Sequence, residues 1–364
     1  MAHEAQVRYS DLVLAKLRAE LVLADGFVFN NDYEGDPKAG AVKIPVRDTE
    51  VAVSDYDKAN GLAPTTGSTT YTTLVIDKDK AVNEVIDGYD AASVPDNLVA
   101  DRLDSAGYSL ARQLDTDGAT TLLAGATAMS VASLTKDNIY SNIVDIRTAM
   151  SKADVPDDGK RYLLVTPDTF ALILKSPEFI SASDLGDSVK QNGILGKIGG
   201  FLVKEWNDST ANLAMIAGHP RYATRVHEWS VPVKVQDLAQ SGDYIGACAV
   251  QGRRVYGHKV LRSTAIRSVF APGTLTVTLA ASDSGKTIAT VTAGNTGTTY
   301  AYKLNPASRA TYDETSTAYD GTSLTSGTTK IAVSEGDVIE IVNLSSSKVK
   351  AVAYVTVTAA DIGA

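Results

Sequence analysis

The segment over residues 42–76 constrains the fold most, because it has the pattern of one long hairpin. Two strand-like stretches, VKIPVRDTEVAV at 42–53 and TTYTTLVID at 69–77, flank the turn-rich sequence KANGLAPTTGS at 58–68. Pro45 cannot donate a hydrogen bond to a ladder, so its strand is expected at a sheet edge. A two-stranded hairpin is at best marginally stable alone in water. The segment therefore needs either the chain's own core or a neighbouring molecule to pack against.

Helical periodicity runs through three other segments. Residues 9–25 predict a helix with its N-cap near Ser10 or Asp11. A second helix is expected to begin near Asp96, and a third near Thr135. Eight apolar residues recur at helical spacing in the second and third helices: Val99, Leu103, Ala106, Leu110, Ile139, Ile143, Ile146 and Met150.

Short strands alternate with these helices. RYLLVTP at 161–167 predicts a buried strand that turns at Pro167 into a helix, DTFALILK. Further strands are expected at 201–206, 212–217 and 244–269. The first 270 residues therefore predict a mixed α and β fold.

The composition changes sharply after Phe270. The last 94 residues contain 18 Thr and 10 Ser but no Phe, Trp, Met or Cys. Apolar residues alternate there in short runs, separated by the turn sequences SDSGK, TAGNTG and SEGD. This pattern predicts a separate all-β sandwich over 272–364, joined at Pro272-Gly273. The alternating residues are Leu275, Val277, Leu279, Tyr300, Tyr302, Leu304, Ile339, Ile341, Val355 and Val357.

Length and charge exclude several classes of protein. The 364 residues allow two or three domains, and the net charge of −9 comes without a run of Lys or Arg. That balance argues against a nucleic-acid reader, although it permits a protein that encloses DNA without binding it tightly. One cysteine, Cys248, excludes an internal disulfide framework. No signal-peptide or membrane-spanning pattern is present, so we expect a soluble cytoplasmic product with no membrane partner.

Two acidic clusters resemble metal loops only in part. NNDYEGDPKAGA at 30–41 begins like a calcium-binding loop, but Ala41 stands where a bidentate Glu is required. DTDGATT at 115–121 fails in the same way at Ala126. Both clusters are interpreted as solvated turns, and no metal site is predicted.

The sequence also lacks the pattern of a nucleotide site or an active site. NGILGKIGG at 192–200 has the wrong spacing for a phosphate-binding loop, and Ile198 stands where Ser or Thr is needed. There is no G-x-S-x-G elbow, and the histidines lack metal-ligand spacing. We therefore predict no catalytic residue, no cofactor and no enzymatic activity. The histidines are His3, His219, His227 and His258.

The order of these segments resembles the major capsid proteins of tailed bacteriophages, the Hong Kong 97-like fold. In that family an N-terminal arm leads into an extended E-loop hairpin and then a spine helix. Here the arm would be 1–40, with NNDYEGDPKAGAVKIPV similar to the entry into the E-loop. The E-loop would be 42–80, ending in LVIDKDKAVNEVID. Residues 95–270 would hold the spine helix and the peripheral and axial domains.

Later stretches carry the same resemblance. RYLLVTPDTFALILKSPEFI is similar to the family's strand-to-helix step, and GILGKIGGFLVKEWN to its Gly-punctuated turn and strand. YIGACAVQGRRVYGHKVLRSTAIRSV is similar to its closing strand, with Tyr256-Gly257 in the usual kind of place. AVSEGDVIEIVN resembles the bacterial immunoglobulin-like modules that some phages append to structural proteins. The resemblance implies an α+β capsid fold over 1–270 and an immunoglobulin-like β-sandwich over 272–364.

The resemblance also implies a function and partners. The chain would assemble with copies of itself into hexamers and pentamers of an icosahedral head. That head would enclose double-stranded DNA without sequence-specific binding and contain a portal protein. The virion would be its location, after assembly in the host cytoplasm. We further hypothesise that the C-terminal domain projects outward and either stabilises the shell or touches the host surface, with a host-surface glycan as its candidate ligand. Deleting 272–364 should then leave assembly intact.

Candidate contacts between subunits lie on segments with little predicted core. Two are in the arm and three in the hairpin; for each, the alternative is an ordinary exposed residue. The candidates are Asp32, Glu34, Arg47, Asp55 and Tyr56.

Two features of the family are not carried over. Some members carry an N-terminal scaffolding segment that is cleaved off, but the arm-like helix here starts by Tyr9. We therefore expect a separate scaffolding protein and a chain incorporated nearly whole. Some members cross-link Lys to Asn covalently. Lys43, Lys58, Lys78 and Lys80 lie in or beside the hairpin, and nothing singles one out, so no cross-link is assigned.

Other functions stay open on the sequence alone. One is a surface adhesin or carbohydrate-binding protein with an immunoglobulin-like domain. Another is an α/β enzyme with an accessory domain. A third is a different phage structural protein, such as a head-decoration or tail-tube subunit.

Overall fold

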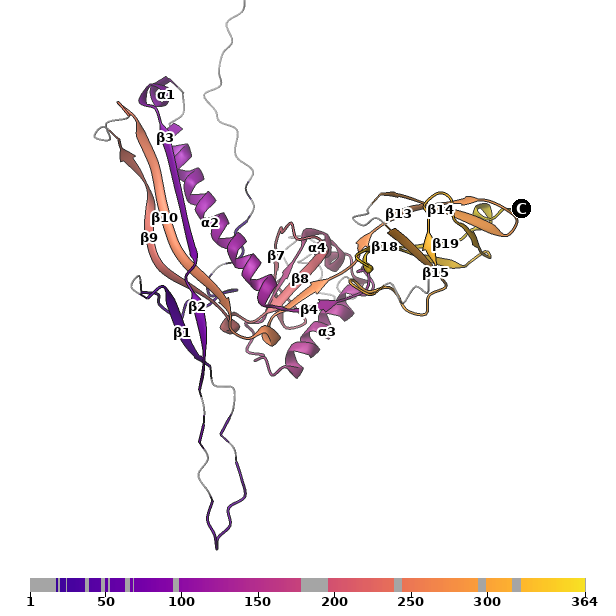
Figure 1. The fold of residues 1–364 in the computed structure, drawn as a ribbon, viewed down its shortest axis with the longest axis horizontal. Coiled ribbons are helices and arrows are strands. Elements are labelled where there is room, and N and C mark those ends of the chain that lie inside the picture. The colour runs from indigo at the N-terminus through magenta and orange to yellow at the C-terminus, as the bar shows by residue number, and fades with distance from the viewer. Residues whose placement is uncertain are drawn as a thin grey trace, which may run out of the picture. The chain divides into compact units, whose positions relative to one another are not determined.

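The computed structural model divides into two compact units, and Figure 1 labels the elements of both. The first unit comprises Met1–Gly125 and Pro220–Ser263, and the second Ala126–His219 and Thr264–Ala364. The structure describes residues 18, 20–23, 25–36, 39–46, 50–51, 53–62, 66–67, 69–93, 98–177, 196–238, 244–293, 299–315 and 322–363. In these residues no helix is long and apolar enough to cross a membrane.

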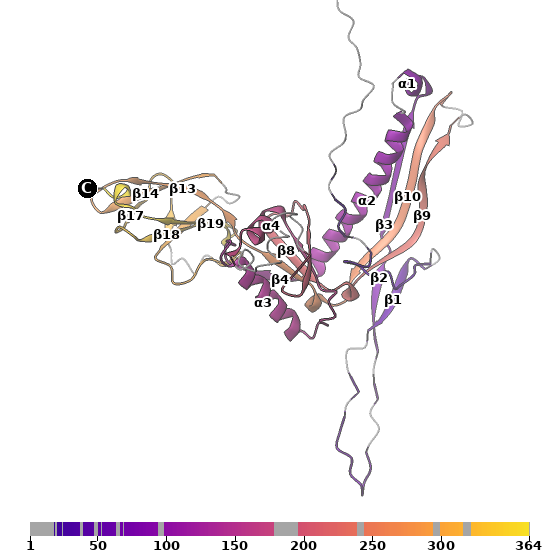
Figure 2. The same ribbon diagram turned by 180° about the vertical axis from the view of Figure 1, so that it is seen from behind.

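The first unit is built on a three-stranded antiparallel sheet in the order β3-β10-β9. The 28-residue helix α2 (Leu98–Gly125) lies along one face of this sheet (Figures 1 and 2). Ala106 of the helix is buried in a cluster with Ile86 and Val250 of the sheet, as the helical spacing predicts. The other elements are β3 (Lys78–Ile86), α1 (Gly88–Ser93), η1 (Pro220–Tyr222), β9 (Ala223–Asp237) and β10 (Cys248–Val260).

Two predictions for this unit are wrong. Residues 115–121 lie inside α2, not in a solvated turn, because their acids have partners that hold them on the helix. The Tyr256 hydroxyl donates to Asp117 at 2.8 Å, and the Leu23 N–H donates to Asp115 at 3.3 Å. Of the helix expected over 9–25, residues 18, 20–23 and 25 are described and are not helical, while the rest, with the expected N-cap at Ser10 or Asp11, lies outside the described residues. Leu23 shows why: its amide bonds to a neighbouring element instead of to its own segment.

The predicted hairpin is confirmed. Strands β1 (Ala41–Val46) and β2 (Thr70–Val75) pair antiparallel, and Pro45 lies opposite Tyr71 in a sheet of only two strands. The base of the hairpin packs on the unit's own core: Ile44 and Leu74 are buried together with Val226 of β9.

The 15-residue strand β9 was not predicted. Its sequence ATRVHEWSVPVKVQD contains Pro232, which normally demotes a strand assignment. Pro232 is tolerated because it falls where the β9–β10 register shifts and because β9 is an edge strand. The single long strand expected over 244–269 divides instead into β10, the short helix η2 (Ser263–Ala265) and β11 (Arg267–Phe270).

The second unit contains a mixed six-stranded sheet in the order β4-β11-β8-β5-β7-β6. Helix α3 (Ile139–Lys152) buries the four predicted residues of its apolar face. Every residue of β5 is buried, and Pro167 begins α4, so the predicted strand-to-helix step is confirmed. The remaining elements are β4 (Thr127–Ser130), β5 (Tyr162–Val165), α4 (Pro167–Leu174), β6 (Lys197–Ile198), β7 (Phe201–Glu205) and β8 (Leu213–Gly218).

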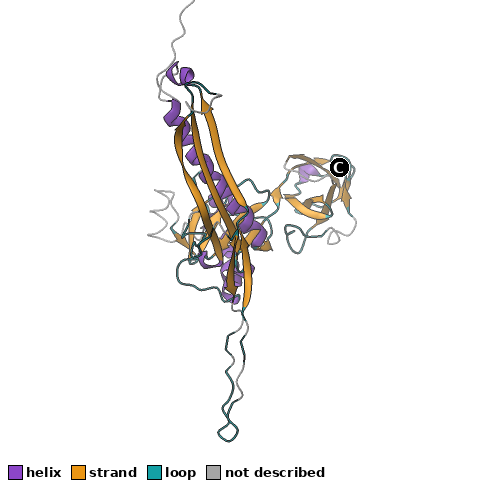
Figure 3. Cartoon of the chain, turned by 60° about the vertical axis from the view of Figure 1, so that its left-hand side comes forward, coloured by secondary structure: helices purple, strands orange, loops and turns teal. Residues whose placement is uncertain are grey.

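The C-terminal residues of the second unit form two further sheets (Figure 3). One has the order β12-β19-β18-β15-β16, and the other β13-β14-β17. They share one apolar cluster that includes Leu275, Ala289 and Ile339, so the predicted alternating strands do pack as two layers. The strands are β12 (Gly273–Thr274), β13 (Thr276–Ala281), β14 (Lys286–Ala293), β15 (Thr299–Leu304), β16 (Ser323–Leu324), β17 (Lys330–Ala332), β18 (Val338–Ser345) and β19 (Lys348–Thr356), followed by η4 (Ala359–Asp361).

Candidate assembly surfaces

The hairpin tip, defined as the described residues between 50 and 62, exposes large apolar side chains. Val51 is 85% exposed, Val53 97%, Tyr56 73% and Leu62 53%. Large apolar side chains gathered on one exposed segment make it a candidate site of association. Figures 1 and 2 show the tip extending beyond the paired strands β1 and β2. Since the base of the hairpin is buried and the tip is not, the surface that needs a partner is the tip.

A defined turn shapes this tip. The Asp57 carboxylate accepts hydrogen bonds from the Ala59 N–H at 2.8 Å and from Asn60 Nδ2 at 2.5 Å. These two bonds lower the pKa of Asp57. The Gly61 N–H donates to the Asp57 carbonyl at 2.7 Å, and Gly61 has φ of +71°, which a residue with a Cβ rarely adopts. The turn is therefore organised before any partner arrives.

At the base of the hairpin, a glycine lets two elements meet closely. A Cβ on Gly257 of β10 would lie 2.6 Å from the Val75 carbonyl oxygen, which is too close for any other residue. The glycine of the Tyr256-Gly257 pair therefore allows β2 to approach β10.

The segment before the predicted contacts in the arm is anchored in the core. Val22, Leu23, Val28 and Phe29 are all buried. The chain then runs beside β9, where the Arg225 N–H donates to the Asn30 carbonyl at 2.8 Å. This segment is consequently part of the first unit's core.

A buried charge cluster ties this segment to the sheet. The Arg225 side chain is 2% exposed and donates to Asp25 at 2.9 Å and to His258 Nε2 at 2.9 Å. Its guanidinium lies 4.7 Å from the centre of the Phe29 ring and 3.9 Å from Asp115. A buried cation with partners on three elements holds those elements in one arrangement.

The cluster shifts the pKa of its members. Burial of Asp25 opposes ionisation, but the hydrogen bond with His227 and the charge of Arg225 hold its pKa below the ordinary value. Burial raises the pKa of Asp115. Burial and then the charge of Arg225 lower the pKa of His258 to about 3. The neutral His258 ring can therefore accept from Arg225 through Nε2, which leaves its proton on Nδ1.

The structure describes four of the five predicted contact residues. Asp32 and Glu34 are exposed and directly follow the anchored segment, while Asp55 and Tyr56 are exposed in the hairpin tip. Arg47 lies outside the described residues. The candidates thus fall on two separate surfaces, one beside β9 and one at the tip.

Sequence reasoning missed two further exposed apolar side chains in the first unit. Tyr89 of α1 is 81% exposed and Ile245 is 95% exposed. The backbone beside these two residues comes close together: a Cβ on Gly88 would lie 2.0 Å from the Gly246 carbonyl oxygen. The available signal was YIG at 244–246, an apolar pair inside a turn sequence.

Nothing in the described residues resembles a metal centre, since no three His, Cys, Asp or Glu side chains gather as ligands. The features that stand out in the first unit are its exposed apolar side chains and its buried charge cluster.

A family model described as phage capsid protein matches residues 84–269, just over half of the chain. A search of curated proteins finds no match. A solved chain of Mycobacterium phage Che8 is 23% identical, with a TM-score of 0.62 over 73% of this chain and 96% of its own length. A chain from the capsid of cyanophage P-SCSP1u is 13% identical, with a TM-score of 0.61 over 73% of this chain and 92% of its own.

A chain from the capsid of Myoviridae phage XM1 is 16% identical, with a TM-score of 0.52 over 72% of this chain and 96% of its own. At these identities the likeness shows the fold, and that fold is a mixed α and β capsid fold. The family match ends before the two C-terminal sheets begin. The chain belongs to the phage capsid protein family.

Proposed function

We propose that this chain is the major capsid protein of a tailed bacteriophage and assembles into the hexamers and pentamers of an icosahedral head. The family is structural, and the matched solved chains include two described as capsids. The observation that carries the proposal is the hairpin tip. Its valines and tyrosine are exposed, yet its turn is already organised, so a second subunit could bury them with little ordering cost.

The parts of the capsid fold would be distributed as follows. Residues 1–40 are the arm and 42–80 the E-loop, and α2 serves as the spine helix. The sheet β3-β10-β9 would form the peripheral domain, and the six-stranded sheet the axial domain. The two C-terminal sheets would be an immunoglobulin-like domain over 272–364, displayed on the outer surface.

Contacts between subunits would use the two surfaces described above. Asp55 and Tyr56 would act with the apolar tip, Asp32 and Glu34 beside β9, and Arg47 within the E-loop. Ring-closing contacts of such surfaces would generate the hexamers and pentamers.

The remaining partners follow from the role of a shell. A net charge of −9 would keep the subunits from binding the enclosed double-stranded DNA tightly. A separate scaffolding protein and a portal protein would take part in assembly in the host cytoplasm. The outer domain would have a host-surface glycan as its candidate ligand.

Electron microscopy of the purified chain tests the proposal, first expressed alone and then with its scaffolding partner. We expect closed shells of uniform diameter, or flat sheets of hexamers. Tubes in both preparations would contradict the proposal and indicate a tail-tube protein. A monodisperse monomer in both would also contradict it, and glycan binding by that monomer would then identify an adhesin.

A further inference from the structure

The C-terminal module, residues 273–363, meets the six-stranded sheet through segments that are far apart in the sequence. One connection is covalent, from β11 through Ala271 and Pro272 to β12. A module held by one such linker would be expected to move relative to its neighbour. Two non-covalent attachments add to this linker in the second unit.

The first attachment is made by residues 305–315, which we call the strap. Thr311 forms an antiparallel bridge with Ala132, just after β4 leaves the sheet. The Tyr312 N–H donates to the Val131 carbonyl at 3.1 Å. The Tyr312 ring stacks on the Phe270 ring with 5.5 Å between centroids and 20° between planes. Backbone pairing and ring stacking thus fix both the position and the rotation of the strap.

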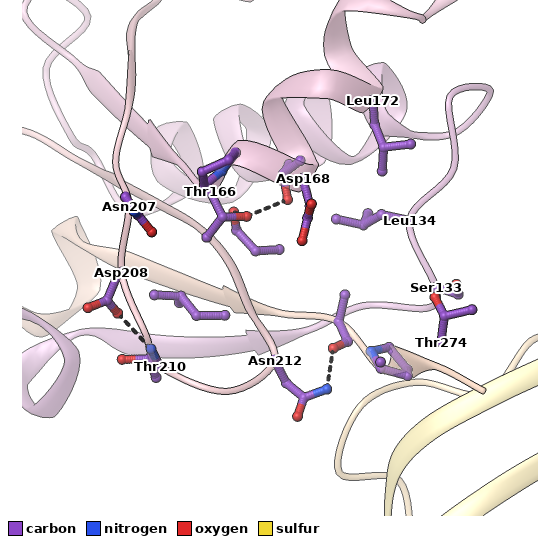
Figure 4. A pocket seen from close by; sticks show the side chains of 17 residues that line it. Ser133, Leu134, Thr166, Asp168, Leu172, Asn207, Asp208, Thr210, Asn212 and Thr274 are labelled. Atoms are coloured by element: carbon purple, nitrogen blue, oxygen red, sulfur yellow. Dashed lines mark hydrogen bonds between the residues drawn. The ribbon is translucent and has the colours of Figure 1, made fainter. Parts of the chain in front are cut away.

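The second attachment is Asn212, in the loop before β8. Its Nδ2 donates to the Ala271 carbonyl at 3.2 Å and to the Lys350 carbonyl of β19 at 2.9 Å. The Ala271 N–H donates back to the Asn212 carbonyl at 3.0 Å. Figure 4 shows the Asn212 side chain directed at the joint. One amide therefore connects the linker and the module to the same loop.

The strap is also bound firmly to the module itself. The buried Ala310 N–H donates to Glu340 at 2.8 Å and to the Tyr354 hydroxyl at 3.0 Å. Lys350 Nζ lies 4.4 Å from the centre of the Tyr312 ring and bonds its hydroxyl at 3.0 Å. A movement of the module would therefore carry the strap with it and break the contacts to Val131 and Phe270.

We propose that the strap and Asn212 fix the module in one orientation on the six-stranded sheet, so that the module is a rigid extension of the sheet. A polar cavity of about 460 Å³ borders the joint beside Asn212 (Figure 4). This side of the joint is open. The orientation of the module therefore depends more on the contacts of the strap and Asn212 than on buried apolar area. The proposal concerns the single chain and does not depend on assembly into shells.

Distance measurements between two spin labels on the unassembled full chain test this proposal. The labels would be placed at Lys152→Cys on α3 and Thr328→Cys on the module, both exposed, in a Cys248→Ala background. The contacts made by the strap and by Asn212 are removed with Tyr312→Ala and Asn212→Gly together. Gly is chosen at position 212 because it accepts the φ of +63° there. The matched control is Tyr302→Ala, which removes a Tyr packed in the module's own core.

We expect a narrow distance distribution in the parent chain and a broad one in the double variant. Tyr302→Ala and Tyr312→Phe should both stay narrow, because the strap remains stacked on Phe270. Amide exchange at Ala271 should become roughly tenfold faster in the double variant only. A broad parent distribution, a narrow distribution in the double variant, or broadening in Tyr302→Ala would each overturn the proposal.

Discussion

The hairpin tip connects β1 to β2, and the strap lies between β15 and β16. The apolar side chains of the tip are exposed, whereas those of the strap are packed. In the tip, Val53 and Tyr56 are 97% and 73% exposed. In the strap, Ala310 is 1% exposed and the Tyr312 ring is stacked on Phe270. Both segments contain ordered turns, so the presence of an ordered turn does not distinguish the tip from the strap.

The two segments differ in whether their apolar side chains find partners within the same chain. The strap makes its contacts within the chain and connects the C-terminal module to the six-stranded sheet. The tip leaves its apolar surface free, although the base of the same hairpin is buried against Val226. We therefore propose the tip, an organised segment with exposed apolar residues, as the contact between subunits.

The largest expected effect is on assembly. Val53→Asp places a charge at the most exposed valine of the tip, so a surface buried between subunits would contain an unpaired carboxylate. We expect electron microscopy to show no shells, while thermal unfolding of the unassembled chain stays unchanged. Thr328→Asp adds the same charge to an exposed position of the module and should assemble normally. Normal shells from Val53→Asp would remove the distinction between tip and strap.

The next effect concerns the core on which the hairpin stands. Arg225→Met leaves Asp25 and Asp115 without their buried partner, which should cost roughly 3–5 kcal/mol of unfolding free energy in urea titrations. Arg253→Met is the control, because the Arg253–Asp79 pair of the same sheet is about half exposed, and it should cause no measurable change. Equal effects of the two variants would show that the cluster does not hold the base in place.

A smaller effect is expected in the strap. Glu340→Leu removes the carboxylate that accepts from the buried Ala310 N–H, at a cost of about 1–3 kcal/mol. Glu335→Leu, at an exposed position before β18, should leave the unfolding free energy of the second unit unchanged. If both variants behave alike in denaturant titrations, the strap is not held by Glu340.

The smallest effect concerns the turn in the tip. The pKa of Asp57 is lowered by hydrogen bonds to its ionised form, so the turn gains its stability above the ordinary value of 3.8 and loses it as the pH falls. The NMR signal of the Ala59 amide should follow this titration, and the signal should not titrate in Asp57→Ala. A parent signal that stays constant as the pH falls from neutral to well below 3.8 would mean that the turn does not depend on this carboxylate.

The periodic elements could be predicted from the sequence because burial imposes their pattern. The four isoleucine and methionine positions of α3 and the fully buried β5 are examples. Strand β9 was missed because Pro232 and its polar outer face hide the pattern. The acids at 115–121 suggested a turn, because their partners, Leu23 and Tyr256, are distant in the sequence.

The candidate surfaces were only partly predictable for the same reason. Tyr56 was proposed as a contact because its segment has little predicted core of its own, which a sequence can show. The strap and Asn212 depend on contacts such as Tyr312 on Phe270 and Asn212 on Lys350, which join segments 42 and 138 positions apart. Local sequence patterns carry no record of such pairs.

Oxidative footprinting of Tyr56 in assembled shells and in unassembled subunits tests the central claim most directly. Both rates would be normalised to the rate in the denatured chain. If the tip is a contact between subunits, Tyr56 should be modified rapidly in the subunit, where it is 73% exposed, and be protected in the shell. Equal modification in both states would show that the tip stays exposed after assembly and would contradict the account.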